Sequence, residues 1–113
     1  HNEEAAKGLV QKIATLPSKP VALCGMLKDK DIHAVMEVLS TCFEYWYLVD
    51  LHVPRAATAK DLAAYQPSAQ CFAFMKDALI AAREKAIAES RPLVVFGSFH
   101  TVADYLLVSE KDK

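Results

Sequence analysis

The residues best suited to chemistry follow a short apolar run near the end of the chain. The run Leu93–Phe96 has the composition of a buried strand, and Gly97, Ser98, His100 and Thr101 come directly after it. A strand that stops at a turn opening a helix is where an open α/β sheet binds a small anion or substrate. The glycine allows a ligand to approach the backbone closely, and the free N–H groups of a first helical turn attract a carboxylate or phosphate.

The same residues also allow a purely structural interpretation. Gly97 can simply make the turn, while Ser98 or Thr101 caps the helix that follows. The segment by itself leaves both interpretations open.

Composition narrows the function classes. The chain has 113 residues, 53% of them hydrophobic, which suits one domain with one core. Its 13 basic and 14 acidic residues give a net charge of −1, so we do not expect nucleic acid as a partner. No apolar stretch approaches the roughly 18 residues of a membrane span, and no signal peptide is visible. Three cysteines without a CxxC pair predict reduced core thiols in a cytoplasmic protein: Cys24, Cys42 and Cys71.

Hydrophobic periodicity predicts alternating helices and strands. A helical stripe runs from Ala6 to Leu16, and a buried strand Val21–Cys24 is closed by Gly25. The later predicted elements are a helix over Ile32–Leu39, a strand over Tyr45–Leu51, a short helix with a Thr58/Asp61 capping box that carries Leu62 and Tyr65, an extended piece at Cys71–Phe72, a helix over Met75–Ala86, the strand at Leu93 and a last helix holding Val102, Ala103, Leu106 and Leu107.

This order predicts an α/β fold with a mostly parallel sheet in three layers, helices covering both faces. The loops after parallel strands leave from one edge, so the loop Lys28–Asp31, the dipeptide Pro54–Arg55 and the segment Gly97–Thr101 should converge there. We assign Tyr45, Trp46 and Tyr47 to the core rather than to an aromatic platform for a ligand. Three scattered glycines form no phosphate loop, so this domain alone cannot cradle a nucleotide.

Four separated motifs resemble one known family. Met26–Ile32, Trp46-Tyr47, Pro54–Ala59 and Gly97–Ala103, in this order and spacing, are similar to the C-terminal domain of the bacterial bifunctional dihydrofolate synthase/folylpolyglutamate synthase family of the Mur ligase superfamily. His1-Asn2 resembles the end of that family's Asp-x-Ala-His-Asn segment. The resemblance covers essentially the whole chain.

The resemblance implies a Rossmann-like C-terminal, glutamate-binding domain, residues 1–113, that is a fragment of a longer cytoplasmic, monomeric ligase. In the implied reaction, ATP activates a pteroate or folate carboxylate as an acyl phosphate. The amine of L-glutamate then displaces phosphate to form an amide, and Mg²⁺ offsets the phosphate charge. ATP and Mg²⁺ would be bound mainly by the ligase's own N-terminal ATPase domain, so the isolated domain should be inactive.

The resemblance also implies roles for individual residues. The implied glutamate-binding residues are Gly97, Ser98, His100 and Thr101, and those on the ATP side or at the domain contact are His1, Asn2, Lys28, Asp29, Lys30, Asp31 and Arg55. No catalytic or metal-binding residue is assigned to this domain. His100 either orients substrate or makes a structural hydrogen bond, Arg55 is alternatively a solvated side chain, and Asp31 alternatively a helix cap.

The chain departs from the family at Ala56, where a Gly usually follows Pro-Arg, which counts against a positive backbone φ there. Two other function classes remain open. The bare α/β pattern equally allows a stand-alone flavodoxin-like binding or regulatory module, and a free cysteine allows a hydrolase.

Overall fold

A computed structural model describes residues 3–28 and 31–97 of the chain. The elements in chain order are α1 (Glu3–Ile13), β1 (Val21–Gly25), α2 (Ile32–Leu39), β2 (Tyr45–Val49), α3 (Ala59–Ala63), β3 (Gln70–Phe72), α4 (Met75–Ala88) and β4 (Leu93–Gly97). The predicted last helix, with Val102, Ala103, Leu106 and Leu107, lies outside the described residues. None of the described helices is long and apolar enough to cross a membrane.

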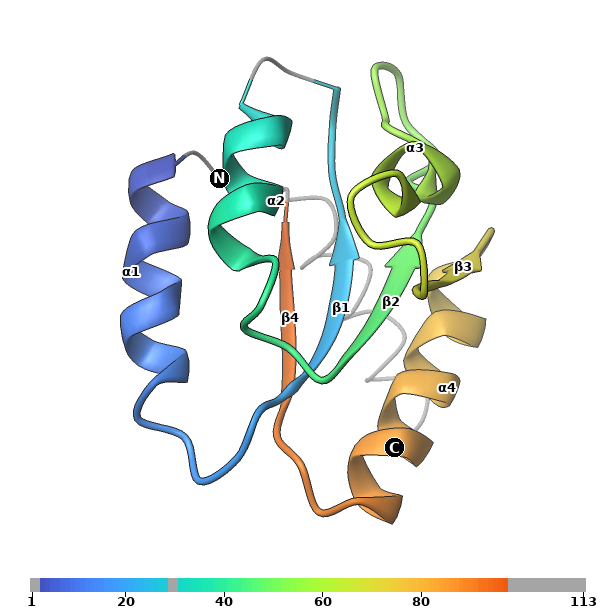
Figure 1. Cartoon of the computed structure of the whole chain (residues 1–113). Coiled ribbons are helices and arrows are strands. Elements are labelled where there is room, and N and C mark those ends of the chain that lie inside the picture. The colour runs from blue at the N-terminus through green and yellow to red at the C-terminus, as the bar shows by residue number, and fades with distance from the viewer. Residues whose placement is uncertain (1–2, 29–30, 98–113) are drawn as a thin grey trace.

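The four strands form one sheet in the order β3-β2-β1-β4 (Figure 1), and every pair is parallel. This confirms the predicted α/β fold. Val21 of β1 lies in register with Tyr45 of β2 on one side and with Leu93 of β4 on the other. All five residues of β1 are buried, because helices cover both of its faces and a strand lies on each side.

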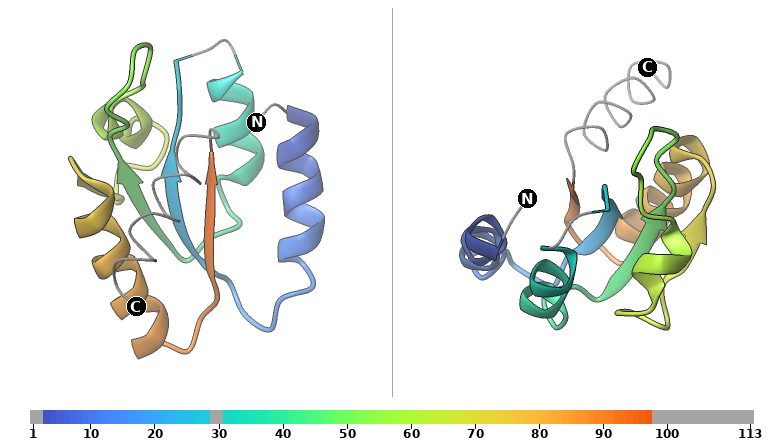
Figure 2. Two further views of the ribbon diagram at one scale, coloured as in Figure 1. Left: turned by 180° about the vertical axis from the view of Figure 1, so that it is seen from behind. Right: turned by 90° about the horizontal axis from the view of Figure 1, so that it is seen from above.

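The helices make the two outer layers (Figure 2). α2 and α3 lie on one face of the sheet, with α1 beside α2, while α4 lies on the other face. Side chains along each strand alternate between these faces, as the period of two requires. Ala22 and Cys24 of β1 belong to the core under α2, and Val21 and Leu23 belong to the core under α4.

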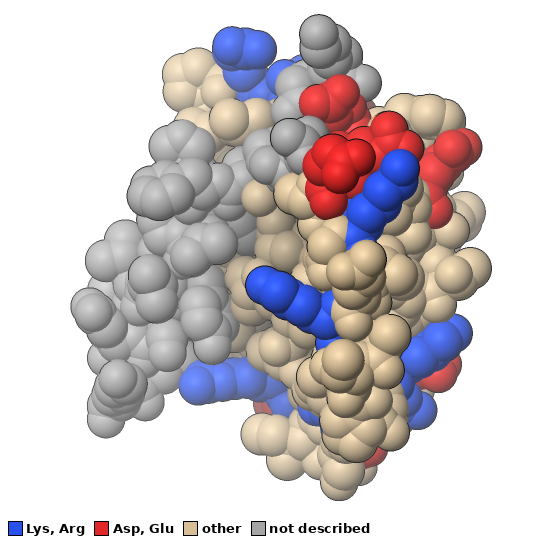
Figure 3. Space-filling view, turned by 90° about the vertical axis from the view of Figure 1, so that its left-hand side faces the viewer, with Lys and Arg blue, Asp and Glu red and all other residues tan. Residues whose placement is uncertain are grey.

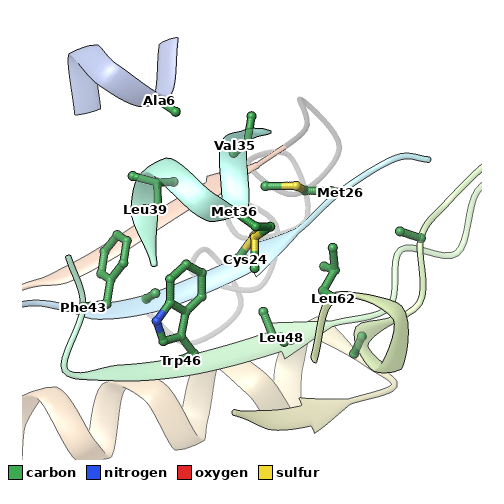
Figure 4. Packing of buried hydrophobic residues seen from close by; sticks show 13 residues of the cluster. Ala6, Cys24, Met26, Val35, Met36, Leu39, Phe43, Trp46, Leu48 and Leu62 are labelled. Carbon is green, nitrogen blue, oxygen red and sulfur yellow. The ribbon is translucent and has the colours of Figure 1, made fainter. Parts of the chain in front are cut away.

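Aromatic side chains fill the core under α2 (Figure 4), where Met36 and Leu39 of the helix point toward Trp46 of β2. The ring of Phe43 lies edge-on to Trp46, with centroids 5.0 Å apart, and stacks on Phe96 at 5.2 Å. Trp46 is 5% exposed and Tyr47 2%. The prediction that these aromatic residues pack in the core is therefore confirmed for both of them.

The cysteines do not all behave as predicted. Cys24 is fully buried and burial strongly raises the pKa of its thiol, whereas Cys42 is half-buried and Cys71 is exposed. The prediction of a core role is wrong for Cys71, because β3 is a three-residue strand at the edge of the sheet, with a neighbouring strand on one side only. The apolar residues next to Cys71 in the sequence did not indicate that it lies at the edge of the sheet.

Some predicted boundaries also move. α1 ends at Ile13 rather than Leu16, since the N–H of Leu16 bonds to the carbonyl of Ile13 in a tight turn. α3 ends before Tyr65, and β2 ends at Val49 rather than Leu51.

On the side of the molecule where α1 lies, acidic groups gather at one end and basic groups lie below them (Figure 3). In α1, Glu3 and Glu4 lie in the first turn, at the positive end of the helix dipole, and Lys12 lies in the last turn, at its negative end.

A polar cluster joins the strands at the end where they begin. The Tyr45 hydroxyl donates a 2.5 Å hydrogen bond to Glu89 Oε2, and Arg91 Nε donates to Glu89 Oε1 at 2.9 Å. Arg91 Nη1 also donates to the carbonyl of Lys19 at 3.0 Å. The turn between α4 and β4 is thereby tied to the starts of β1 and β2.

We predict that Glu89→Gln destabilises the domain in a pH-dependent way. Hydrogen bonds from Tyr45 and Arg91 hold the pKa of the Glu89 carboxyl below its usual range. A lowered folded-state pKa contributes stability above the pKa of the unfolded chain and loses it as the pH falls through the folded-state pKa. Thermal unfolding should therefore show a lower Tm for the variant at pH 7 and a smaller difference near pH 3. A difference that grows toward low pH would contradict this assignment.

Candidate functional site

All four strands end at the same edge of the sheet, which we call the carboxyl edge. The last residues of β1, β2 and β4 therefore lie at one edge, and the described parts of the loops after β1 and β2 leave from it as predicted. β1 connects forward to β2 on one side, while β4 lies on its other side, so the order of strands reverses beside β1. Open α/β sheets bind ligands in the crevice at such a reversal, outside the carboxyl ends of the strands.

Two glycine residues meet at this reversal. Gly25 ends β1 and Gly97 ends β4, and they lie opposite each other in the parallel register. A Cβ atom at Gly97 would overlap the carbonyl oxygen of Gly25, and Gly97 has a φ of +131°. Only glycine fits, because a side chain would clash and the backbone conformation disfavours it. Gly97 was predicted as a site residue for its role toward a ligand. In the structure, the neighbouring strand β1 already requires a glycine at this position.

Gly25 was not among the predicted site residues. The sequence did contain a signal for Gly25, because this glycine comes directly after the apolar run of β1 and so marks the end of a strand. What the sequence does not contain is the pairing of β1 with β4, which lies about seventy residues away along the chain.

The loops after β1 and β2 are joined to each other. The N–H of Lys28 donates to the carbonyl of Arg55 at 2.5 Å, and the N–H of Ala57 donates to the carbonyl of Met26 at 2.9 Å. Together with the antiparallel bridge between Leu27 and Ala56, these bonds make a short two-stranded ribbon. Lys28 and Arg55 therefore lie opposite each other, and both side chains are exposed.

Arg55 adopts a left-handed backbone conformation, with a φ of +66°. The positive φ in this loop belongs to Arg55 and not to Ala56, in keeping with the alanine at the position where the family usually has glycine. A non-glycine residue in this region costs about 1–3 kcal/mol, so the surrounding hydrogen bonds must hold it. The ribbon with Lys28 supplies one of them.

Asp50 holds the other end of this loop. Its Oδ1 accepts a 2.6 Å hydrogen bond from the N–H of Ala59 at the start of α3. The predicted capping box is confirmed, because Thr58 Oγ1 accepts from the N–H of Asp61 at 3.0 Å and Asp61 Oδ2 accepts from the N–H of Thr58 at 3.1 Å. These bonds lower the pKa of the Asp61 carboxyl. Sequence reasoning did not select Asp50, whose position after β2 was its only signal.

The remaining predicted site residues divide into two groups. Asp31 takes the N-cap position of α2, as its alternative interpretation as a helix cap expected, although its side chain makes no capping hydrogen bond. Ser98, His100, Thr101, His1, Asn2, Asp29 and Lys30 lie outside the described residues. Among the described residues, no three His, Cys, Asp or Glu side chains gather in a way that could hold a metal ion.

A cavity of about 450 Å³ borders Gly97 on the side of α1. Apolar side chains make most of its wall, including Leu9, Val35 and Phe96, and Lys12 lies at its margin. Burial raises the pKa of the thiols of Cys24 and Cys42, which disfavours their reactive thiolate forms and counts against either as the nucleophile of a cysteine hydrolase.

The family described as Mur ligase, glutamate ligase domain, matches residues 1–99 of the chain. Among curated relatives, the dihydrofolate synthase/folylpolyglutamate synthases of Haemophilus influenzae and Escherichia coli are 35% and 38% identical to it. These matches cover 97% and 96% of the chain but 27% and 26% of the relatives, so the chain spans about a quarter of their length.

Solved structures agree with these matches. The bifunctional folylpolyglutamate synthase/dihydrofolate synthase of Yersinia pestis, complexed with AMPPNP and a Mn ion, is 36% identical, with a TM-score of 0.87 over 97% of this chain and 27% of that one. A structure of a bifunctional folylpolyglutamate synthase/dihydrofolate synthase with Mn, AMPPNP and L-glutamate bound has a TM-score of 0.79, at 33% identity over 97% of this chain and 27% of that one.

We predict that Gly97→Ala destabilises the domain by at least about 2 kcal/mol, because it combines a forbidden φ with the overlap on Gly25. Gly8→Ala is the matched control. It adds a methyl group to α1 where nothing lies within 4 Å, and it should stabilise by about 0.5–1 kcal/mol. Urea unfolding of both variants measures the difference, and equal effects would contradict the close approach of the strands.

Asp50→Ala should destabilise the domain by about 1–2 kcal/mol, since the first N–H of α3 loses its acceptor. Asp50→Asn keeps an oxygen at the same place and should lose less than half as much. Amide hydrogen exchange should also rise at Ala59 in the alanine variant. Unchanged exchange there would show that Asp50 does not hold the loop.

Proposed function

Because the chain belongs to the Mur ligase family and matches the C-terminal domain of dihydrofolate synthase/folylpolyglutamate synthases, we propose that it is the glutamate-binding domain of such a ligase. The observation that carries the proposal is the reversal of strand order at Gly25 and Gly97, where backbone without side chains lies at the carboxyl edge. The family match does not favour a stand-alone flavodoxin-like module.

In the proposed reaction, ATP phosphorylates the carboxylate of a pteroate or folate substrate. The amine of L-glutamate attacks the acyl phosphate, a C–N bond forms, and phosphate leaves. This domain would hold the amino acid through Gly97, Ser98, His100 and Thr101. Solved relatives bind ATP analogues, and one of them also binds L-glutamate, which supports this assignment.

The ribbon of the β1 and β2 loops would form the ATP side of the site or the contact with the rest of the ligase. Its support is that Lys28 and Arg55 come from different loops yet lie opposite each other at the carboxyl edge. Two adjacent cations favour anionic groups such as phosphates. The residues His1, Asn2, Asp29, Lys30 and Asp31 belong to the same proposed surface.

ATP and Mg²⁺ would be bound mainly by the part of the ligase that this chain does not include. The described residues contain neither a metal-binding group of three side chains nor a glycine-rich phosphate loop. The divalent ion would offset phosphate charge during transfer, and this domain would contribute backbone and cationic groups at its edge. Such a ligase would act in the cytoplasm as a monomer.

A chimaera tests the proposal. This chain replaces the matching C-terminal segment of the Escherichia coli relative, and phosphate release is measured with ATP, dihydropteroate and L-glutamate. We expect glutamate-dependent release from the chimaera and none from the isolated chain. Lys28→Met combined with Arg55→Met should raise the KM for ATP about tenfold. Lys85→Met, which removes a cation beside Tyr45 at the start of β2, should leave it unchanged. A folded chimaera that binds ADP but releases no phosphate would overturn the proposal.

A further inference from the structure

Among the described residues, one large aromatic side chain is exposed at the carboxyl edge. Phe74 is 58% exposed and comes two residues after the end of β3. The other exposed large hydrophobic residues of the described part are Ile80 and Ile87. They lie further along α4, which runs from the carboxyl edge back toward the start of β4 (Figure 1). Single exposed apolar side chains are ordinary on protein surfaces, so exposure alone does not assign Phe74 a function.

The ring of His52 backs the ring of Phe74. The two rings are stacked, with centroids 5.0 Å apart and planes 18° from parallel. His52 Nε2 lies 2.5 Å from the carbonyl oxygen of Ala73, which can only accept, so this nitrogen carries the proton and donates. His52 follows β2 and Phe74 follows the neighbouring strand β3, so the pair joins two loops of the carboxyl edge. The structure thus fixes the Phe74 ring and leaves much of it open to solvent.

Phe74 is an unfavourable residue for its position in the fold. It is the N-cap of α4, and its side chain makes no capping hydrogen bond. Ser, Thr, Asp and Asn are preferred there, because their side-chain oxygen accepts from the free N–H groups of the first turn. Phe74 therefore forgoes a cap and also leaves apolar surface in water. A residue that breaks two local rules is a candidate for a contact outside its own domain.

The place of Phe74 in the sheet indicates which partner it meets. The chain spans about a quarter of the length of its relatives. In the proposed function, the rest of the ligase holds ATP and the folate substrate, while glutamate lies at the carboxyl edge of this domain. The reacting groups can meet only if the rest of the ligase faces that edge. Phe74 lies on the same edge as the ribbon of Lys28 and Arg55, on the β3 side of the sheet.

We propose that the Phe74 ring, backed by His52, is an apolar anchor for the contact between this domain and the rest of the ligase. The inference rests on the proposed function. The surface that covers Phe74 is apolar, because a charged group placed against the ring would lose water without gaining a partner. An aromatic ring that is already held in place suits this task, since little side-chain freedom is lost when the contact forms.

Amide hydrogen exchange in the isolated chain and in the chimaera tests this inference. Met75 and Lys76 lie in the first turn of α4, which has no side-chain cap, so their N–H groups should exchange fast in the isolated chain. In the chimaera these groups should exchange about tenfold more slowly, because the partner surface covers them. Ser90 and Arg91, at the opposite end of α4, should exchange equally in both proteins. Equal exchange at Met75 and Lys76 would overturn the inference.

Variants separate the anchor from the fold. Phe74→Ser loses the stacking on His52 but gains a capping oxygen, so the Tm of the isolated chain should change by less than about 3 °C. In the chimaera, the same variant should lower kcat/KM for glutamate-dependent phosphate release about tenfold, whereas Phe74→Leu, which keeps an apolar side chain, should retain most of it. Ile87→Ser is the matched control, since Ile87 is 77% exposed near the other end of α4, and it should leave kcat/KM unchanged. Equal kcat/KM for the two serine variants would contradict the anchor.

The outcomes distinguish this inference from the proposed function. A chimaera that releases phosphate while Met75 and Lys76 exchange as in the isolated chain contradicts the anchor alone. A chimaera that releases no phosphate contradicts the proposed function, and hydrogen exchange still reports whether the partner covers Phe74. Sedimentation of the isolated chain tests a second copy as the occupant. We expect a monomer at every concentration, and a dimer that Phe74→Ser abolishes would overturn the inference.

Discussion

The close approach of β1 and β4 at Gly25 and Gly97 is the constraint on which the site depends. Two parallel strands end side by side, and the carbonyl oxygen of Gly25 occupies the space that a Cβ atom at Gly97 would need. The contact places bare backbone where the order of strands reverses, which is where α/β sheets bind ligands. A larger residue at position 97 would push the strands apart and cover the crevice at the same time.

The two ends of the sheet are stabilised by different means. Where the strands begin, Glu89 collects hydrogen bonds from Tyr45 and Arg91, so charged side chains join the α4–β4 turn to the sheet. At the carboxyl edge, backbone bonds from Lys28 to Arg55 and from Ala57 to Met26 join the loops, and the side chains of Lys28 and Arg55 stay exposed. Where the strands begin, the polar side chains are bonded to one another. Each end also holds one non-glycine residue with a positive φ, Ser90 in the α4–β4 turn and Arg55 in the β2 loop.

Much of the fold could be predicted because its signals are local. Helical stripes, apolar strands and the capping box of Thr58 and Asp61 depend on residues a few positions apart, and the structure confirms the capping box, the parallel sheet and the buried Trp46. The exposure of Cys71 could not be predicted in this way. It depends on β3 lying at the edge of the sheet, which is decided by strand order and not by the apolar neighbours of the cysteine.

The sequence by itself determined the family, through motifs that keep their order and spacing, and it selected Gly97, Lys28 and Arg55 as site residues. Only the tertiary structure decided which residues meet. Gly25 pairs with Gly97, Lys28 lies opposite Arg55, and Asp50 holds the start of α3. For the first two pairs the physical reason is that the contacts join segments far apart in the chain through backbone pairing, which carries no side-chain signature. Asp50 bonds through its side chain to Ala59, nine positions on, and only the path of the loop between them brings the two together.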